Sequence, residues 1–467
     1  MYETIIKPNV IYFLRNKMRI QFISIISIGL LWALSCSKEK MPTFDSDAQV
    51  SHIIQQWNNL FLDLDRNTPN YRPPLAARSF AYISLIAYET AIPALDQYRS
   101  MNSMLNGMNI STLHCPVNYN LVDALNTSYA KSFRYFFKSA PLEEIEKINR
   151  LEKHFNASSL KYASINYSDS SMIFANSITD AIISWSAQDK WGDQGDFHLY
   201  DSCYKIEDKP GFWRSPKLHP SLPILPHWGE VRPFAIDPSL IKVNPPMDYS
   251  VDKSSQMYKE AIEVYSMSQP LSEENKWISE FWSDDHHGLT FTPSTRWVSI
   301  TNQVIKLTKP NIGKQLETYL KVGLALCDAG IVVWKTKYKY KRERPIEFIN
   351  RVINSNWESY HDSPPFPTYP SGHSAFGASA AQVLSQLYGN QFAFTDFSHV
   401  DRKEFNGSPR SFISFYDMAK ENAFSRISMG VHYRNDCEEG LRIGFNIGNI
   451  ISKINLLKSN EAVLYNK

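Results

Sequence analysis

Apolar residues recur at helical spacing along most of the chain. In "VSHIIQQWNNLFLDL" (residues 50–64) and in "PLAARSFAYISLIAYETAI" (residues 74–92) they return every three or four positions, which is typical of amphipathic helices. The second segment follows Pro73, and proline is well suited to the first turn of a helix. The same spacing predicts further helices at about 119–137, 142–165, 170–188, 251–267, 271–284, 296–308, 311–342, 371–389, 410–428 and 436–456.

These elements predict an all-α protein. Strand-like alternation is weak, and no repeat or glycine-rich linker divides the chain. We therefore expect one compact, large helical-bundle domain, which could divide near residue 245 into two bundle-like halves, residues 51–250 and 251–460. The passage "KPGFWRSPKLHPSLPILPHWGEVRPF" (residues 209–234) interrupts the first half, and its density of proline predicts an ordered surface loop.

Positive and negative charges are nearly balanced. The 467 residues include 49 Lys or Arg and 47 Asp or Glu, which gives a net charge of +2 with neutral histidine. No overall field therefore favours nucleic acid, and any anion site must come from local clustering of cations. Hydrophobic residues make up 43% of the chain, which is enough for a large buried core.

The N-terminus has the pattern of an export signal. Lys17 and Arg19 precede an apolar run, residues 20–34, that is short for a membrane span. The run ends in "ALSC", and Cys36 is followed by polar residues, as in bacterial lipoprotein signals. We therefore expect residues 1–36 to be a lipoprotein-type signal peptide with Cys36 as the lipidation site. The alternative is an ordinary cleaved signal.

Either signal exports the mature protein. The expected location is the periplasm or the cell surface of a Gram-negative bacterium, with membrane contact only through the lipid on Cys36 and residues 37–50 as a polar tether. In an oxidising compartment Cys115 and Cys203, which lie in loop-like sequence, could form a disulfide. The cysteines lack Cys-x-x-Cys spacing, so no zinc site is expected, and Cys327 should lie in the core.

Three segments of the second half carry candidate chemistry, the first being "WKTKYKYKRERP" (residues 334–345). Lys337 and Arg344 lie seven residues apart, so one continuous helix would bring them to nearly the same face. Pro345 would end that helix. Taken alone, such a run of charges more often faces solvent at a helix C-terminus, where cations suit the dipole.

The second segment, "PTYPSGHSAFGASAAQ", places Ser371, Gly372 and His373 at the start of a helix. Free backbone N–H groups at a helix start bind anions, and Gly372 lets an anion approach the backbone closely. The small residues that follow allow neighbouring helices to pack near this point. The competing interpretation is a plain serine cap beside an exposed histidine.

The third segment is "FSRISMGVHYRNDCEEG" (residues 424–440). Arg426 and His432 lie six residues apart, and a break at Gly430 would let them converge. Asp436 lies four residues after His432, so its carboxylate could hold one ring nitrogen and leave the other free as a ligand or nucleophile. The alternative is a core histidine beside a surface ion pair. Together the three segments predict a cradle of three cations, two histidines and one helix N-terminus for a tetrahedral oxyanion.

In order, spacing and residue type, the three segments resemble the signature of the type 2 phosphatidic acid phosphatase superfamily, which includes vanadium-dependent haloperoxidases and bacterial acid phosphatases. The matching residues are Lys337, Arg344, Pro345, Pro370, Ser371, Gly372, His373, Ser425, Arg426, Gly430, Val431, His432 and Asp436. The segments "PPLAARSFAYISLIAYETA", "PHWGEVRPF" and "FWSDDHHGLTFTPSTRW" also resemble bacterial vanadium-dependent haloperoxidases, including iodoperoxidases. Trp334 and Phe366 match aromatic residues on the halide side of the haloperoxidase pocket, which favours that branch.

The resemblance implies a vanadate cofactor and a role for each matching residue. His432 would bind vanadium through a ring nitrogen, with Asp436 as the partner that orients the ring. His373 would serve as acid and base toward hydrogen peroxide and the oxidised product, and Lys337 would polarise the peroxide for attack by halide. The vanadate oxygens would be bound by charge-assisted and ordinary hydrogen bonds from Lys337, Arg344, Ser371, Gly372, His373 and Arg426.

The implied activity is oxidation of halide, with iodide and/or bromide favoured, by hydrogen peroxide to hypohalous acid that halogenates a small organic acceptor. Phosphate could occupy the site in the absence of vanadate. The alternative is an acid phosphatase of the same superfamily, in which His432 attacks phosphorus and His373 protonates the leaving group. A non-catalytic lipoprotein that binds an anion or a polysaccharide is a third interpretation, and the presence of both histidines argues against it.

One position departs from the family pattern. An acidic residue is expected in close relatives where this chain has Thr368, so the outer pocket is expected to differ. Asp284, Asp285 and His286 could lie near the site, although no strict motif places them there.

Overall fold

The computed structural model describes residues 47–110, 116, 119–159, 165–195, 197–215 and 222–458. The signal peptide with Cys36, most of the tether and Cys115 lie outside these residues. From Asp47 onward the chain forms one compact unit, and its division into two halves near residue 245 stays a prediction. Within the described residues, no helix has both the length and the hydropathy needed to cross a membrane.

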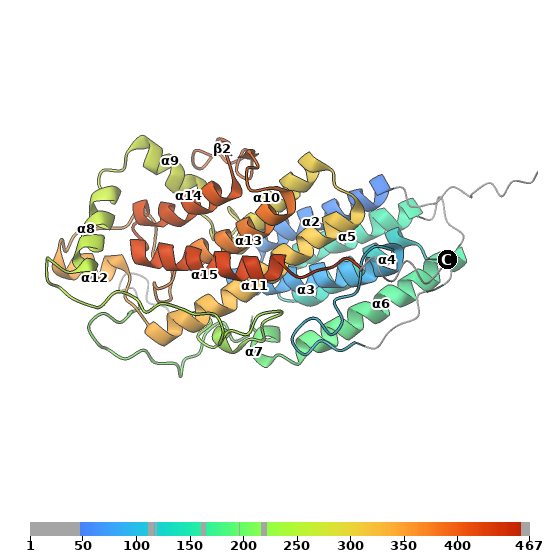
Figure 1. Cartoon of the computed structure of the whole chain (residues 1–467), viewed down its shortest axis with the longest axis horizontal. Helices are drawn as coiled ribbons and strands as arrows, with labels where there is room; N and C mark the ends of the chain where they lie inside the picture. The colour runs from blue at the N-terminus through green and yellow to red at the C-terminus, as the bar shows by residue number, and fades with distance from the viewer. Residues whose placement is uncertain are drawn as a thin grey trace, which may run out of the picture. The chain divides into compact units, whose positions relative to one another are not determined.

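The structure confirms the all-α expectation (Figure 1). The first half contains α2 (Asp47–Asn67), α3 (Pro73–Ala91), η1 (Ile92–Ala94), α4 (Leu121–Phe136), α5 (Leu142–Ser159), α6 (Ile165–Ala187), α7 (Lys190–Asp193) and η2 (Trp228–Glu230). The second half contains α8 (Gln256–Ser268), α9 (Glu273–Phe281), α10 (Pro293–Thr308), α11 (Ile312–Tyr340), α12 (Pro345–Val352), α13 (Gly372–Tyr388), α14 (Phe415–Ser428) and α15 (Arg434–Ser452). Two short strands, β1 (Phe394–Asp396) and β2 (Arg410–Phe412), pair antiparallel.

The end of α11 differs from the sequence-based expectation. The helix stops at Tyr340, because Lys341 adopts a left-handed conformation with a φ of 52°. Pro345 therefore begins the next helix, α12, instead of ending the previous one. Arg344 lies directly before α12 and does not share a helix with Lys337, so the predicted same-face arrangement on one helix is wrong.

The predicted helix at 410–428 also begins later than expected. Residues 410–412 form strand β2, and α14 begins only at Phe415. The side chain of Ser414 caps this helix by accepting a hydrogen bond from the backbone N–H of Asp417 at 3.1 Å. The serine cap therefore sets the start of the helix, and the residues before it are free to join the hairpin.

Helix α13 is packed between α10, α11, α14 and α15, and its contact with α15 is particularly close (Figure 1). Helix α15 presents Gly440, Gly444 and Gly448 to α13. A Cβ atom on these glycines would lie 2.4–2.6 Å from backbone oxygens of α13 or its cap, which no real side chain tolerates. The small residues of α13 thus serve close backbone packing, and this packing brings the start of α15 to the start of α13.

Helix α11 joins the first half of the chain to the site. It packs against α3, all 19 residues of which are buried, and against α13 and α15. Its buried Asp328 accepts hydrogen bonds from the backbone N–H groups of Phe234, Ala235 and Ile236 at 2.7, 3.0 and 3.2 Å. The carboxylate therefore anchors the long connection between α7 and α8 to the core.

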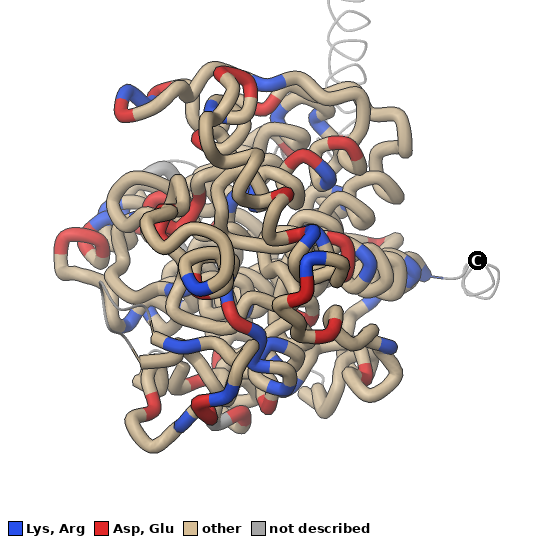
Figure 2. Tube along the Cα trace, turned by 90° about the vertical axis from the view of Figure 1, so that its left-hand side faces the viewer, with Lys and Arg blue, Asp and Glu red and all other residues tan. Residues whose placement is uncertain are grey.

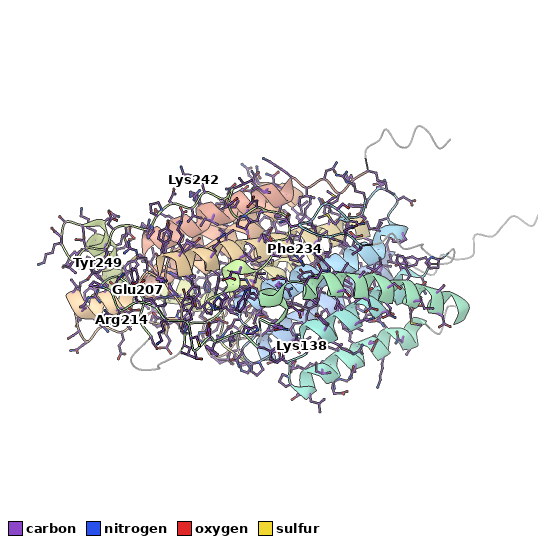
Figure 3. The ribbon with its side chains drawn as sticks, turned by 90° about the horizontal axis from the view of Figure 1, so that it is seen from below. Lys138, Glu207, Arg214, Phe234, Lys242 and Tyr249 are labelled. Carbon is purple, nitrogen blue, oxygen red and sulfur yellow. The ribbon has the colours of Figure 1, made fainter. Side chains whose placement is uncertain are left out.

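The structure describes residues 197–215 and 222–255 of this connection, and several labelled residues in Figure 3, from Glu207 to Tyr249, mark its course. Its side chains do not stay at the surface, however. Trp213, Trp228 and Phe234 are buried, and the last two belong to the main hydrophobic core. The expectation of a surface loop is therefore wrong for these residues, whose apolar side chains are the reason that the loop is fixed.

Candidate active site

The charged residues on the face shown in Figure 2 are mixed in sign, in keeping with the net charge of +2. The concentrated positive charge lies inside the protein, where the three candidate segments meet. Lys337 is in the last turn of α11, Arg344 precedes α12, Ser371 to His373 start α13, Arg426 is in the last turn of α14, and His432 lies between α14 and α15. The predicted convergence of these segments is confirmed.

The three cations are buried. Lys337 and Arg344 are fully inaccessible, and Arg426 is nearly so. Burial lowers the pKa of both arginines to about 10, and burial together with the nearby Arg344 guanidinium lowers the pKa of Lys337 well below its ordinary value. Three buried cations so close together repel one another, and a multivalent anion between them would offset both the repulsion and the loss of hydration.

Two of the cations are fixed by backbone oxygens and keep donors to spare. The ammonium group of Lys337 donates to the carbonyl oxygens of Pro367 and Thr368 at 2.9 and 2.8 Å, which leaves one of its three N–H groups. Arg344 donates from Nε to the oxygen of Phe366 at 3.1 Å and from Nη1 to the oxygen of Val431 at 2.9 Å. Its Nη2 is buried and has no hydrogen-bond partner among the described residues.

The geometry around His432 determines its tautomer. Nη1 of Arg344 lies 3.1 Å from Nε2 of His432, and since a guanidinium only donates, Nε2 must accept and carries a lone pair. The proton of the neutral ring is then on Nδ1, which lies 3.0 Å from Oδ2 of Asp436. Burial, Arg344 and Lys337 all lower the pKa of His432, so the ring is neutral. Asp436 therefore holds one ring nitrogen, as predicted, while the lone pair of the other nitrogen accepts from Arg344 and could act as a ligand only in place of that bond.

Asp436 is placed by the fold of the α15 start. Its Oδ2 accepts a hydrogen bond from the backbone N–H of Tyr433 at 3.0 Å, as a residue three positions into a helix commonly does. Its backbone oxygen accepts from the N–H of Ser371 at 2.9 Å, which ties the starts of α13 and α15 together. Burial raises the pKa of Asp436 to about 6, while the Thr368 hydroxyl and Lys337 lower it, so the carboxylate is ionised at neutral pH.

His373 lies opposite His432 and pairs with the third cation. Nη1 of Arg426 lies 3.0 Å from Nε2 of His373, which must accept for the same reason as above. Arg426 is held in place by the hydroxyl of Ser425 and the backbone oxygen of Trp282. Burial, followed by the charges of Arg426, Arg344 and Lys337, lowers the pKa of His373 well below its ordinary value.

Neither packing nor backbone conformation requires a glycine at position 372. Its φ is not positive, and a Cβ atom there would make only ordinary contacts, at 3.5 Å from Trp334 and 3.8 Å from Phe376. Gly372 also lines a cavity. A side chain at this position would therefore fill the space in front of the α13 N-terminus, where an anion would approach the backbone N–H groups.

The site opens into a cavity of about 450 Å³. His432, His373, Arg426 and Gly372 line its inner part, whereas Lys337, Arg344 and Ser371 do not line it and are fully buried. Trp334 and Phe366 form an apolar wall, with ring centroids 5.2 Å apart. The ammonium of Lys337 lies 5.2 Å from the centre of the Phe366 ring, so this ring lies beside one of the buried cations, and the place of both aromatic residues in a halide pocket stays a prediction.

Two aspartates and two histidines also line the cavity, and the sequence suggested only three of these four residues. Asp284, Asp285 and His286 line it, together with His361, which sequence reasoning missed because no motif surrounds it. Burial raises the pKa of Asp284 to about 7 and that of Asp285 to about 6, although nearby arginines oppose the shift. Burial lowers the pKa of His361 to about 4, so this ring is neutral.

Thr368 does not lie where the sequence placed it. It was expected to alter the outer pocket, but it is buried and does not line the cavity. Its hydroxyl group lies 2.9 Å from Nδ1 of His432 and 2.5 Å from Oδ2 of Asp436, on the side of the ring away from Nε2. Elsewhere, Cys327 is buried as predicted and Cys203 is exposed, whereas the suggested pairing of Cys203 with Cys115 falls outside the described residues.

Chemically, the site can bind a tetrahedral oxyanion. It offers unused donors on buried cations, a helix N-terminus without an obstructing side chain, and an imidazole lone pair that could reach the central atom of the anion. It also holds a second neutral imidazole, at His373, that can exchange a proton.

The matched family model describes a VCPO second helical-bundle domain and covers residues 317–456, which include all three segments. Vanadium chloroperoxidase of Curvularia inaequalis is 21% identical over 497 residues, which cover 85% of this chain and 81% of that protein.

Solved structures are similar as well. The crystal structure of the first bacterial vanadium-dependent iodoperoxidase is similar with a TM-score of 0.80 and 27% identity, covering 88% of this chain and 98% of that one. The holo form of a bacterial vanadium-dependent chloroperoxidase gives a TM-score of 0.63 at 16% identity, over 84% and 94% of the two chains, and shares the fold.

The open space at position 372 gives a first prediction. Gly372→Ala should leave the melting temperature unchanged within about 2 °C, because the new methyl group meets only ordinary contacts. It should weaken the binding of inorganic phosphate, measured by calorimetry, by about tenfold or more, because the methyl group blocks the approach to the backbone. Unchanged phosphate affinity would show that the anion does not bind at the α13 N-terminus.

Proposed function

This chain belongs to the vanadium haloperoxidase family, and on that basis we propose that it oxidises halide with hydrogen peroxide by means of a vanadate cofactor. The observation that carries the proposal is the Nε2 lone pair of His432, which lies among three buried cations. A passive anion site would need the cations but not an imidazole fixed in one tautomer.

The residues present fit vanadate. The unpartnered Nη2 of Arg344, the third N–H of Lys337 and the open face of Gly372 are suited to oxyanion oxygens, and His432 Nε2 is suited to the metal. Ser371 caps α13 with its hydroxyl oxygen, which accepts from the N–H of Ser374 at 3.4 Å, so its hydroxyl proton remains available to an oxygen of the cofactor.

When bound, vanadate would supply Lewis-acid activation of hydrogen peroxide toward halide. The protein supplies a rigid positive environment, because the cations are fixed by backbone oxygens before any ligand arrives. His373 would hold and move protons. The nearby cations lower the pKa of His373, and an anion bound among them would offset this electrostatic effect. The pKa of His373 would then rise toward the range in which the ring exchanges protons at neutral pH.

We propose iodide as the preferred halide, with bromide as a second substrate. Iodide is the most easily oxidised of these ions, and the aromatic wall of Trp334 and Phe366 suits a large, polarisable anion. The similarity to a bacterial iodoperoxidase over 88% of the chain supports the same choice. The hypohalous acid formed would halogenate a small organic acceptor within reach of the cavity.

The decisive test is activity with and without vanadate. Purified mature protein loaded with orthovanadate should form triiodide from iodide and hydrogen peroxide, and His432→Ala should lose at least 99% of this activity, because the cofactor loses its protein ligand. His154→Ala, at an exposed histidine of α5, is the matched control and should retain full activity. Hydrolysis of p-nitrophenyl phosphate without vanadate, and no halide oxidation with it, would instead support a phosphatase.

The acidic group in the cavity predicts a pH dependence. As the pH rises from about 5 to about 8, Asp284 and Asp285 lose their protons and add negative charge that repels halide, so the KM for iodide should rise. Asp284→Asn should reduce this rise several-fold, whereas Asp180→Asn, at an exposed position of α6, should not. An equal rise in wild type and Asp284→Asn would exclude this carboxyl as the cause.

We further propose that the protein is a periplasmic or cell-surface lipoprotein of a Gram-negative bacterium, anchored through Cys36, because the first 36 residues have the pattern of a lipoprotein signal. Cys36→Ser should therefore move the protein from the membrane fraction to the soluble fraction of the cells that express it. Exposed Cys203 serves as the control, because Cys203→Ser should leave the distribution unchanged. Persistent membrane attachment of Cys36→Ser would contradict the lipid anchor.

A further inference from the structure

We propose that Thr368 is a positioning residue for the oxyanion site, and that its hydroxyl group fixes the His432–Asp436 pair. The inference deepens the proposed function, because it concerns the residues that would orient the cofactor's histidine ligand. Thr368 does not line the cavity, so it would act through its neighbours.

The direction of its hydrogen bonds follows from the chemistry of the partners. Oδ2 of Asp436 already accepts from the backbone N–H of Tyr433, and the Thr368 hydroxyl donates its proton to the same oxygen across 2.5 Å. A lone pair of the same hydroxyl then faces Nδ1 of His432 at 2.9 Å. The Nδ1 proton is therefore shared between two acceptors, the Asp436 carboxylate and the Thr368 hydroxyl, and both hold the ring in the tautomer that exposes Nε2.

Thr368 is itself fixed at both ends of its backbone. Its N–H donates to the backbone oxygen of Arg342 at 3.0 Å, and its carbonyl oxygen accepts from the ammonium group of Lys337 at 2.8 Å. One residue thus connects a cation of the cradle, the imidazole and the carboxylate. The arrangement leaves the side chain little freedom to rotate, so the hydroxyl group restricts rotation of the His432 ring.

A neutral hydroxyl group has an advantage over the acidic residue that the sequence pattern led us to expect here. A second carboxylate would lie beside Asp436, where the two negative charges would repel each other and one would take up a proton. It would also cancel positive charge near Lys337 and Arg344. Threonine completes the hydrogen bonding of Asp436 without reducing the attraction of the cradle for an anion.

The test measures anion binding by the apoprotein, without peroxide or halide. Thr368→Val keeps the branched shape but removes the hydroxyl group, and Thr368→Ser keeps the hydroxyl group. Titration calorimetry with orthovanadate, and separately with inorganic phosphate, should show affinity about tenfold or more weaker for Thr368→Val and within about twofold of wild type for Thr368→Ser. The matched control is Thr301→Val on α10, where a buried hydroxyl donates to the oxygen of Trp297 at 2.7 Å, and it should bind normally.

Two results would overturn the inference: wild-type affinity in Thr368→Val, or equal losses in Thr368→Val and Thr368→Ser. If Thr368→Val does not fold, Thr368→Cys gives the same comparison, because a thiol of similar size is a much weaker donor. Failure of the proposed function is distinguishable. Protein that binds both anions with the predicted dependence on Thr368, but does not oxidise iodide, would refute the haloperoxidase proposal and leave the role of Thr368 intact.

Discussion

The site depends on one electrostatic constraint, the burial of Lys337, Arg344 and Arg426 around two uncharged imidazoles. Such cations are costly to hold in the interior unless hydrogen bonds compensate them. The protein supplies these bonds chiefly from backbone carbonyl oxygens, which neutralise no charge. The positive potential therefore stays available to an incoming anion, and together with burial it keeps His373 and His432 neutral, as their proposed roles require.

The packing of the helices holds these groups at fixed positions. Glycines of α15 lie directly against the backbone of α13, so the two helices cannot slide without steric conflict. As a result Ser371 and Asp436, which come from separate segments, are joined by a hydrogen bond from the backbone N–H of Ser371 to the backbone oxygen of Asp436. The long connection between α7 and α8 is fastened to α11 through hydrogen bonds to the carboxylate of Asp328.

Much of this could be predicted from the sequence. Helical periodicity identified nearly all the long helices, and the motif spacing brought together Lys337, Arg344, Arg426 and both histidines. The break at Gly430 was predictable because a glycine permits the φ of 84° found there. The left-handed turn at Lys341, which separates Lys337 from Arg344, could not be predicted. Lysine seldom adopts that conformation, and no local sequence pattern indicates it. The places of His361 in the cavity and of Thr368 beside His432 were equally hidden, since only tertiary packing decides what a loop residue faces.

The hydrogen bonds of the Arg344 guanidinium have one more consequence. They connect the loop at Phe366, the turn at Val431 and the ring of His432. The bonds to Phe366 and Val431 are internal to the protein, so the loop and the turn remain cross-linked when an anion binds, whereas the contact with Nε2 of His432 would give way to the central atom of the anion. The oxyanion would thus bind and leave without rearrangement of the backbone. Its affinity would then be limited by the cost of desolvation and not by the cost of ordering the chain.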